Sequence, residues 1–347
     1  MQGEKQYKTG LDVGSTTAKI VIIDESGQTV FSRYERHNAQ VNDLLSAYFR
    51  EARQELGNIE TSIAVTGSVG MGTAEQLRTE FIQEVVAATR YAQQLYPSAS
   101  ALIDIGGEDA KVVLFQGNHI DLRMNGNCAG GTGAFIDQMA VLLGDIEELS
   151  RLALQAEHIH PIAARCGVFS KTDIQNLVSR NVPLGDIAAS IFHAVAVQTI
   201  VTLSRGWTFH PPILLCGGPL TFIPALRKAF ADYLHLQESD FILPASGNLL
   251  PALGCALCAT EEKAVSLSTL ENLISRSTNI TTKNSLPPLF DSETDYDNWK
   301  KEKAHYNWPS APLVQGIQEA VLGIDSGSTT TKIVVTTPDG AILFSHY

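Results

Sequence analysis

The feature that most constrains the fold is an internal repeat close to the two ends of the chain. Residues 10–34 read GLDVGSTTAKIVIIDESGQTVFSRY, and residues 323–347 read GIDSGSTTTKIVVTTPDGAILFSHY. The two segments align without a gap at a constant offset of 313 residues, and 13 of the 25 aligned positions are identical. Self-similarity of this kind indicates a duplicated structural unit. We therefore expect the second copy to begin a second domain like the first.

The repeat and the composition between its copies predict three parts. Residues 5–275 would form a complete domain. Residues 276–320 are polar and rich in Pro, Ser, Thr, Asp and Lys, which is typical of a linker. Residues 321–347 would be the truncated start of the second domain, because the repeat ends after its first hairpin.

Composition excludes several classes of protein. Of the 347 residues, 44% are hydrophobic and 18% are charged, as in globular proteins with a sizeable core. The formal net charge of -12 disfavours nucleic-acid binding, because an acidic surface repels phosphate backbones. The N-terminal residues show no apolar leader, and the most apolar stretch, residues 191–203, contains His193 and is too short to cross a bilayer. We therefore expect a cytoplasmic protein with no membrane segment.

Apolar periodicity predicts alternating strands and helices through the first domain. Residues 11–24 and 30–33 are typical of a hairpin, as are residues 102–105 and 110–115, which flank a Gly-Gly turn. Short buried strands are expected at residues 63–66 and 213–216. Helical spacing is found over residues 42–54, 134–143, 172–179, 187–204, 223–230 and 251–263. The alternation indicates an α/β fold.

The tip of the first hairpin carries residues suited to phosphate binding. A glycine there lets the backbone approach a ligand closely, and successive N–H groups and hydroxyls can hydrogen-bond phosphate oxygens. The candidate phosphate-binding residues are Gly14, Ser15, Thr16, Thr17 and Lys19. Asp12 can hold a hydrated Mg²⁺ ion. The alternative interpretation is a plain hairpin with a glycine turn.

Two further glycine-rich turns repeat this logic. The sequence from Asp104 to Glu108 places an acid before Gly106 and Gly107, again between two strands. The pair Gly217 and Gly218 follows a strand and precedes a helix, which would let the backbone lie flat against a purine and its ribose. Each turn alone is a weak signal, whereas their order and spacing together predict a nucleotide site between two related half-domains.

The three turns resemble the phosphate-1, phosphate-2 and adenosine motifs of the actin/Hsp70/sugar-kinase superfamily, whose fold is ribonuclease H-like with two related half-domains. More narrowly, NCAGGTG at residues 127–133 and RCGVFSKTD at residues 165–173 resemble the ATP-dependent activators of 2-hydroxyacyl-CoA dehydratases and benzoyl-CoA reductases. This resemblance covers nearly all of residues 8–265. Large members of that family carry two such domains in tandem, which suits the repeat.

The resemblance implies that Cys128 and Cys166 bind a 4Fe–4S cluster shared across a two-fold interface. Each cysteine precedes a predicted helix, and helix N-termini favour thiolates and anionic groups. A cubane takes four thiolates, so a homodimer or a tandem pseudo-dimer would have to supply the other two. The alternative is a pair of buried structural cysteines.

The remaining three cysteines are interpreted as core residues. Cys255 and Cys258 form a CxxC pair, which can bind metal or act in redox chemistry. They lie in an apolar helical run without a second CxxC or a nearby histidine, so packing is favoured. Cys216, between a strand and Gly217, is interpreted in the same way.

The resemblance implies an ATPase that donates a low-potential electron to a partner iron–sulfur dehydratase or reductase. Ferredoxin or flavodoxin would in turn reduce the ATPase. Asp12 and Asp104 would hold Mg²⁺ and water, and Gly217 and Gly218 would hold the adenosine. Glu108 stands where the small activators usually carry glutamine, and it would position or deprotonate the attacking water. Two alternatives remain open: a small-molecule kinase, for instance of an amino sugar, and a non-enzymatic ATP-gated scaffold.

Overall fold

The computed structural model describes residues 6–117, 119–125, 131–163, 167–260, 264–276, 286–305, 307–314, 316, 319–327 and 330–347. The chain divides into two compact units, Met1–Asn279 and Ile280–Tyr347.

Unit 1 begins with a sheet built around the first hairpin. Its strand order is β11-β4-β1-β2-β3, and β5 also pairs with β4. The strands β1 to β3 form an antiparallel meander, and β1 pairs parallel with β4. The bounds are β1 (Tyr7–Val13), β2 (Thr17–Ile23), β3 (Thr29–Arg36), β4 (Glu60–Thr66), β5 (Glu80–Phe81) and β11 (Ala264–Ser266).

The second sheet of unit 1 repeats this topology. Its order is β10-β9-β6-β7-β8, with the meander β6 to β8 antiparallel and with β6 parallel to β9. The strand β10 pairs parallel with β9, as β5 does with β4. The bounds are β6 (Ala101–Ile105), β7 (Ala110–Gln116), β8 (His119–Asn125), β9 (Ile213–Cys216) and β10 (Phe241–Ile242). Unit 1 is therefore an internal duplication, and each half is a lobe.

Helices cover the two faces of each sheet and form the cores. On the first sheet, α1, α2 and α11 pack against Leu11, Ile20 and their neighbours. On the second, α4 to α7 and α9 pack against Ile103, Ile105 and Val112. The bounds are α1 (Val41–Leu56), α2 (Gly70–Leu77), α4 (Gly133–Leu143), α5 (Ile146–Ala153), α6 (Gly167–Ser179), α7 (Leu184–Ser204), α9 (Pro224–Leu234) and α11 (Leu267–Ser275).

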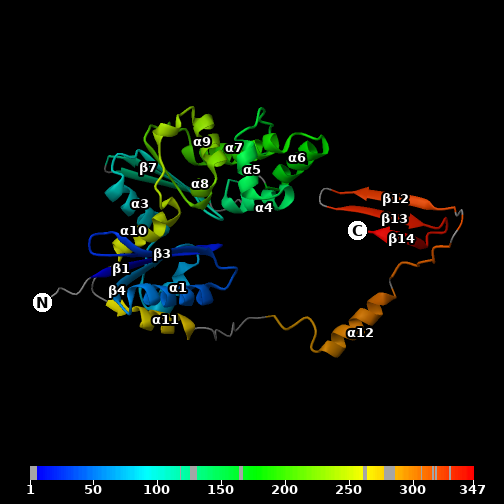
Figure 1. Ribbon diagram of the computed structural model, residues 1–347, viewed down its shortest axis with the longest axis horizontal. Coiled ribbons are helices and arrows are strands. Elements are labelled where there is room, and N and C mark those ends of the chain that lie inside the picture. The colour runs from blue at the N-terminus through cyan, green and yellow to red at the C-terminus, as the bar shows by residue number, and fades with distance from the viewer. Residues whose placement is uncertain are drawn as a thin grey trace. The chain divides into compact units, whose positions relative to one another are not determined.

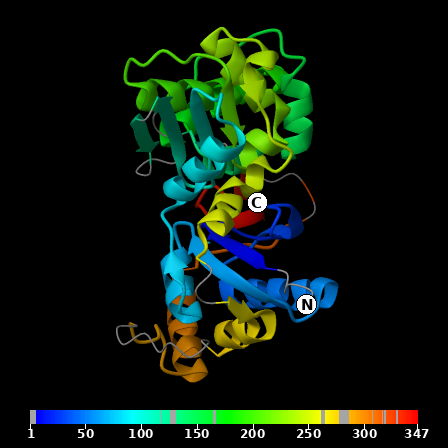
Figure 2. The same cartoon turned by 90° about the vertical axis from the view of Figure 1, so that its left-hand side faces the viewer.

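Two helices occupy the space between the lobes. Helix α3 (Glu84–Leu95) contributes Ala87 to a cluster with the first sheet and Ala88 to a cluster with the second. Helix α10 (Leu250–Cys258) does the same through Ala252 and Leu250, and it lies between the lobes in Figures 1 and 2. The inner faces of both sheets therefore meet across α3 and α10. The short helix α8 (Gly218–Phe222) follows β9 directly.

Several predicted helices differ in length from the structure. The helix expected over residues 172–179 begins at Gly167, and the one expected over residues 223–230 ends at Leu234. The helix expected over residues 251–263 ends at Cys258, and β11 then adds a strand to the first sheet. The apolar stretch judged too short for a bilayer belongs to α7, which has 21 residues and is long and apolar enough by composition to cross one. That judgement was wrong about length, because the helix begins seven residues earlier, at Leu184. Helix α7 is mostly buried inside its lobe, which is typical of a core helix.

In the part of unit 2 that the structure describes there are one helix and one small sheet. Helix α12 (Glu293–Ala304) carries Tyr296 and Trp299, which pack with Phe290 in an aromatic cluster. The strands β12 (Val321–Ser326), β13 (Thr331–Thr336) and β14 (Ile342–His346) form an antiparallel meander in that order. This is the arrangement of β1 to β3, as the repeat predicts.

Candidate active site

Strand alternation places two acidic residues on the inner faces of the lobes. Leu11 and Val13 point into the outer core of the first lobe, so Asp12 between them points the other way. Ile103 and Ile105 likewise point into the core of the second lobe and turn Asp104 inward. Both carboxylates are almost fully buried, at 1% and 3% exposure. The two lobes thus present one acid each to the cleft between them.

A backbone hydrogen bond and an ion pair hold the first turn in place. Gly14 N donates to Thr17 O at 3.0 Å, and Lys19 Nζ donates to Asp12 Oδ2 at 2.7 Å. Burial lowers the pKa of Lys19, but the Asp12 carboxylate outweighs that effect and the net pKa is raised, so Lys19 stays charged. Among the described residues, the buried Asp12 Oδ1 has no hydrogen-bond partner. A carboxylate oxygen left available in this way fits Mg²⁺, which prefers oxygen ligands.

The second turn lies against the first because glycine occupies it. A Cβ at Gly107 would come within 2.4 Å of Thr16 Oγ1, so a side chain there would push the two turns apart. Gly106 N donates to Asp109 O at 2.8 Å, which closes the second turn as Gly14 and Thr17 close the first. Two glycine turns in contact leave backbone groups of both lobes facing one recess, an arrangement suited to phosphates.

A buried lysine balances several acids at the inner end of the cleft. Lys111 Nζ donates to Glu84 Oε1 at 2.8 Å and to Asp109 Oδ1 at 3.0 Å. Burial raises the pKa of Asp104, and Lys111 partly offsets this. Burial and the Asp12 charge raise the pKa of Glu84 to about 7, with Lys111 again opposing. The cleft therefore holds closely spaced ionisable groups, as functional sites often do.

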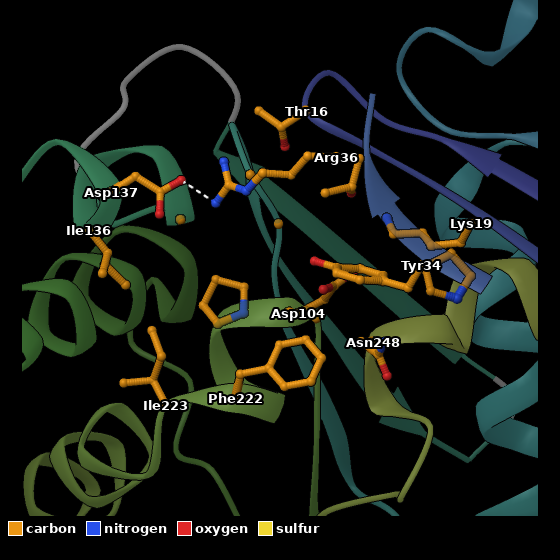
Figure 3. A pocket seen from close by; sticks show the side chains of 18 of the residues that line it. Thr16, Lys19, Tyr34, Arg36, Asp104, Ile136, Asp137, Phe222, Ile223 and Asn248 are labelled. Atoms are coloured by element: carbon orange, nitrogen blue, oxygen red, sulfur yellow. Dashed lines mark hydrogen bonds and ion pairs between the residues drawn. The ribbon is translucent and has the colours of Figure 1, made fainter. Parts of the chain in front are cut away.

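A partly apolar recess adjoins the turns. Figure 3 shows Tyr34 and Phe222 projecting into it from opposite lobes, and their ring centroids are 5.7 Å apart. Arg36 and Asp137 point toward one another in the same view, with Nη2 and Oδ2 2.7 Å apart. Gly217, with a φ of 88°, passes so close to Ile105 that a Cβ would lie 2.1 Å from its carbonyl oxygen. A partly apolar recess beside two glycine turns fits a nucleoside.

The second turn is also bonded to helix α4. Gly133 N donates to Gly106 O at 2.9 Å, and Ala134 N donates to Gly107 O at 2.7 Å. These N–H groups belong to the first turn of the helix, where backbone N–H groups have no hydrogen-bond partner within the helix. The second turn is thereby connected to the chain segment that follows residues 126–130.

The structure brings the described candidate residues from the sequence to two adjoining recesses. The first recess is lined by Thr16, Thr17, Lys19, Asp104, Gly106, Gly107, Gly217 and Gly218. The second is lined by Asp12, Gly14, Ser15, Thr16, Thr17, Lys19, Gly106, Gly107 and Glu108. Glu108 is exposed at the tip of its turn. The roles of these residues stay predictions.

The predicted cluster ligands, Cys128 and Cys166, lie outside the described residues. Within the described part of the chain, no group of three or more His, Cys, Asp or Glu side chains is arranged to hold a metal ion. Cys216 and Cys255 are fully buried, as predicted for core residues, and burial raises the pKa of both thiols. Cys258, which was also interpreted as a core residue, is only partly buried.

Sequence reasoning missed several residues that line the cleft. Glu84 belongs to no glycine turn and starts a helix, and its only local signal is an acid at a helix N-terminus. Tyr34 and Arg36 come from β3, and they meet Asp137 of α4 and Phe222 of α8 only in the folded chain. No sequence pattern relates Arg36 to Asp137, which are 101 residues apart.

The sequence pattern of the BadF/BadG/BcrA/BcrD ATPase family matches residues 9–259. The chain belongs to this family. The matched range contains the two glycine turns, the Gly217–Gly218 turn and both predicted cluster cysteines. The family resemblance inferred from the sequence is therefore confirmed, and so is the interpretation of the chain as an ATPase.

Two individual relatives support the assignment to the BadF/BadG/BcrA/BcrD family. The chain is 28% identical to the 2-hydroxyisocaproyl-CoA dehydratase activator of Clostridioides difficile, over 77% of this chain and 100% of that one. It is 29% identical to the (R)-2-hydroxyglutaryl-CoA dehydratase activating ATPase of Acidaminococcus fermentans, over 74% and 98% of the two chains.

A solved structure supports the fold of this family member directly. The activator of the 2-hydroxyisocaproyl-CoA dehydratase from Clostridium difficile with bound ADPNP superimposes with a TM-score of 0.62 at 26% identity, covering 79% of this chain and 99% of that one. Together with the duplicated sheet topology, this confirms the actin/Hsp70/sugar-kinase-like fold with two related half-domains.

Proposed function

We propose that this protein hydrolyses MgATP and couples the reaction to one-electron transfer from a 4Fe–4S cluster to an iron–sulfur dehydratase or reductase. Family membership supports the ATPase activity, and the names of the relatives support an activator role. A cytoplasmic location and a ferredoxin or flavodoxin as the upstream electron donor belong to the same proposal.

The observation that carries the proposal is the backbone connection between the second turn and helix α4. The carbonyl groups of Gly106 and Gly107 each accept a hydrogen bond from the first residues of that helix. A nucleotide that shifts these two glycines would move the start of α4, and Cys128 lies five residues before Gly133. The state of the nucleotide would thereby reach the segment that carries a cluster ligand.

The nucleotide would bind in the cleft between the lobes. Residues 14–17 and 106–107 would hold the phosphates, with the Lys19 charge nearby, and Gly217 and Gly218 would hold the adenosine. Asp12 and Asp104 would hold Mg²⁺, a role that the available Asp12 Oδ1 supports. The bound ADPNP of the related solved structure supports nucleotide binding by this protein.

Cys128 and Cys166 would bind the cluster, which when bound supplies one-electron redox chemistry. Helix α6 begins at Gly167, directly after Cys166, so its N-terminal partial charge favours a thiolate there. Cys216 and Cys255 do not fit this role, because burial raises the pKa of their thiols and ligation needs the thiolate. Two cysteines per domain imply a homodimer or a tandem pseudo-dimer.

Anaerobic purification of the Cys128→Ser and Cys166→Ser variants tests the cluster. Wild-type protein is expected to show a broad brown absorbance and about four irons per pair of domains. Each serine variant should lose the iron and the ability to reduce an oxidised electron acceptor while still binding MgATP. The matched controls Cys255→Ala and Cys258→Ala should keep their iron, because their positions are far from both motif loops in the sequence.

If Cys255→Ala and Cys258→Ala lose the iron while the two serine variants keep it, the CxxC pair is the metal site and the proposal is wrong. Wild-type protein that phosphorylates an amino sugar would favour the kinase alternative. A cluster-linked dimer that binds ATP without hydrolysing it would favour the scaffold.

A further inference from the structure

An ion pair on the solvent side of the cleft joins the two lobes. Arg36 is the last residue of β3 in the first lobe, and Asp137 lies on α4 in the second. Figure 3 shows the two side chains pointing toward one another, with Nη2 and Oδ2 2.7 Å apart. Both line the partly apolar recess, and they are 59% and 45% exposed. The pair therefore spans the opening of the recess in which a nucleoside would bind.

The alternation of side chains along β3 directs Arg36 toward the second lobe. Phe31 packs in the core of the first lobe, and Arg33 forms ion pairs with α1 of that lobe. Tyr34 and Arg36 therefore lie on the other face of the strand. Tyr34 contacts Phe222 of the second lobe, with ring centroids 5.7 Å apart. Two successive side chains on one face of β3 thus bridge the cleft.

Each partner of the ion pair is attached to one of the glycine turns. On the first lobe, His37 follows Arg36 directly, and its backbone N–H donates to Thr16 O at 3.2 Å. On the second lobe, Asp137 lies about one helical turn after Gly133, whose N–H donates to the second turn at 2.9 Å. The ion pair therefore closes a ring of contacts that includes both turns. When the turns move apart, the ion pair must lengthen or break.

The exposure of the ion pair limits its strength. A pair this exposed changes an equilibrium by at most about 5-fold, because water and salt screen the two charges. It can therefore favour a closed cleft without preventing the cleft from opening. Its effect should also weaken as ionic strength rises.

We propose that the Arg36–Asp137 ion pair is a latch across the nucleotide cleft, which slows both the entry and the exit of nucleotide. The proposal rests on the nucleotide site proposed above. Because a single opening serves entry and exit, loss of the latch raises both rate constants and leaves the affinity nearly unchanged. A side chain that bound the nucleotide itself would instead change the dissociation rate constant and the affinity together.

The test measures the binding and release of Mg–mant-ADP, a fluorescent ADP, by stopped flow with the full chain. Asp137→Asn should raise the association and the dissociation rate constants by about 3- to 5-fold each, with Kd within about 2-fold of wild type. Arg33→Gln is the matched control, because the ion pairs of Arg33 stay within the first lobe. It should bind and release mant-ADP at the wild-type rates.

A charge swap tests whether the two side chains act as a pair. Arg36→Asp alone places two negative charges opposite one another, so it should speed exchange at least as much as Asp137→Asn. Adding Asp137→Arg to the same chain reverses the pair and should restore both rate constants to within about 2-fold of wild type. The excess rate of Asp137→Asn over wild type should shrink as the salt concentration rises from about 0.05 M to about 0.5 M.

Three results would overturn the latch. Wild-type rate constants in Asp137→Asn would do so. A faster dissociation with a matching loss of affinity would make the pair a contact to the nucleotide instead. A charge-swapped double variant that exchanges as fast as Arg36→Asp would show that the two charges do not act together.

Failure of the latch is distinguishable from failure of the proposed nucleotide site. Wild-type protein that does not bind mant-ADP, or binds it without competition from ATP, overturns both. Wild-type protein that binds mant-ADP in competition with ATP, with exchange rates equal to those of Asp137→Asn, overturns the latch alone.

Discussion

The meanders β1–β3 and β12–β14 are the same local structure in two environments. Asp12 lies opposite Lys19 and Asp325 opposite Lys332, which is the same register, and the outer strand pair of each meander is interrupted by a bulge at the corresponding position. Each copy closes its turn with one backbone hydrogen bond of 3.0 Å. The repeated sequence therefore specifies strand pairing, turn and ion pair without help from the rest of the chain.

The two copies differ in how deeply their side chains are buried. The Asp12 side chain is 1% exposed and that of Asp325 is 64% exposed. In the first copy, α1, α10 and the parallel strand β4 cover the meander, whereas all of β12 is exposed in unit 2. The same residues can thus form a buried charged site in one unit and a solvated ion pair in the other, because burial comes from elements distant in the sequence.

The largest expected difference between the copies concerns hydrolysis. Asp12→Ala should lower Mg²⁺-dependent ATP hydrolysis by about 10³-fold, because it removes the oxygen proposed to hold the cation inside a water-poor cleft. Asp325→Ala should leave hydrolysis unchanged. Steady-state phosphate release of the two variants measures both. Equal activity in Asp12→Ala and wild type would contradict the assignment of the first turn.

A second difference concerns the ion pairs. Lys19→Met leaves a buried carboxylate without its partner and should cost about 3 kcal/mol of unfolding free energy. Lys332→Met removes an exposed pair and should cost under about 1 kcal/mol. Urea unfolding measures both.

The pH dependence follows from the raised pKa of Lys19. Its stabilisation is fully present below the ordinary lysine pKa of 10.5 and is lost only as pH rises through the higher folded value. The cost of Lys19→Met should therefore be the same at about pH 8 and about pH 9, a range above the pKa of Glu84, whose charge also raises the pKa of Lys19. A cost that changes between those two values would contradict the assignment.

The third comparison concerns the glycine at the equivalent position of each copy, Gly10 and Gly323. A Cβ at Gly10 would lie 1.9 Å from the Ala252 carbonyl oxygen of α10, whereas a Cβ at Gly323 would meet nothing nearer than Val334 O at 3.8 Å. Gly10→Ala should cost about 2 kcal/mol by overpacking. Gly323→Ala should change unfolding free energy by at most about 0.5 kcal/mol, since the strand itself accommodates a side chain. Similar losses in the two variants would show that β12 packs against another part of the protein.

The smallest effect is expected from removing the second copy. Deleting residues 316–347 should leave the Tm of unit 1 unchanged, because the two units are separately compact. Thermal unfolding followed by circular dichroism tests this, with nucleotide binding as the control for a native unit 1. A marked drop in Tm would show that the second copy stabilises the first domain.

Local signals explain why much of unit 1 could be predicted. Apolar periodicity located α1, α4, α7 and both glycine hairpins, because these patterns are read within a few residues. The same reasoning did not identify α3 or β8 as elements. Helix α3 buries small residues, among them Ala87, Ala88 and Ala92, between two sheets, so it lacks a one-sided stripe of large apolar residues.

The sequence alone determined the repeated hairpin, the order of the glycine turns and the inward direction of Asp12 and Asp104. These follow from interactions between residues close along the chain and from the two-residue period of a strand. Only the tertiary structure decided that Glu84 captures Lys111 and that Arg36 reaches Asp137 across the cleft. It also decided that Asp12 is buried while Asp325 is not. Those outcomes depend on which distant elements share a surface, and burial then sets how strongly each charge interacts.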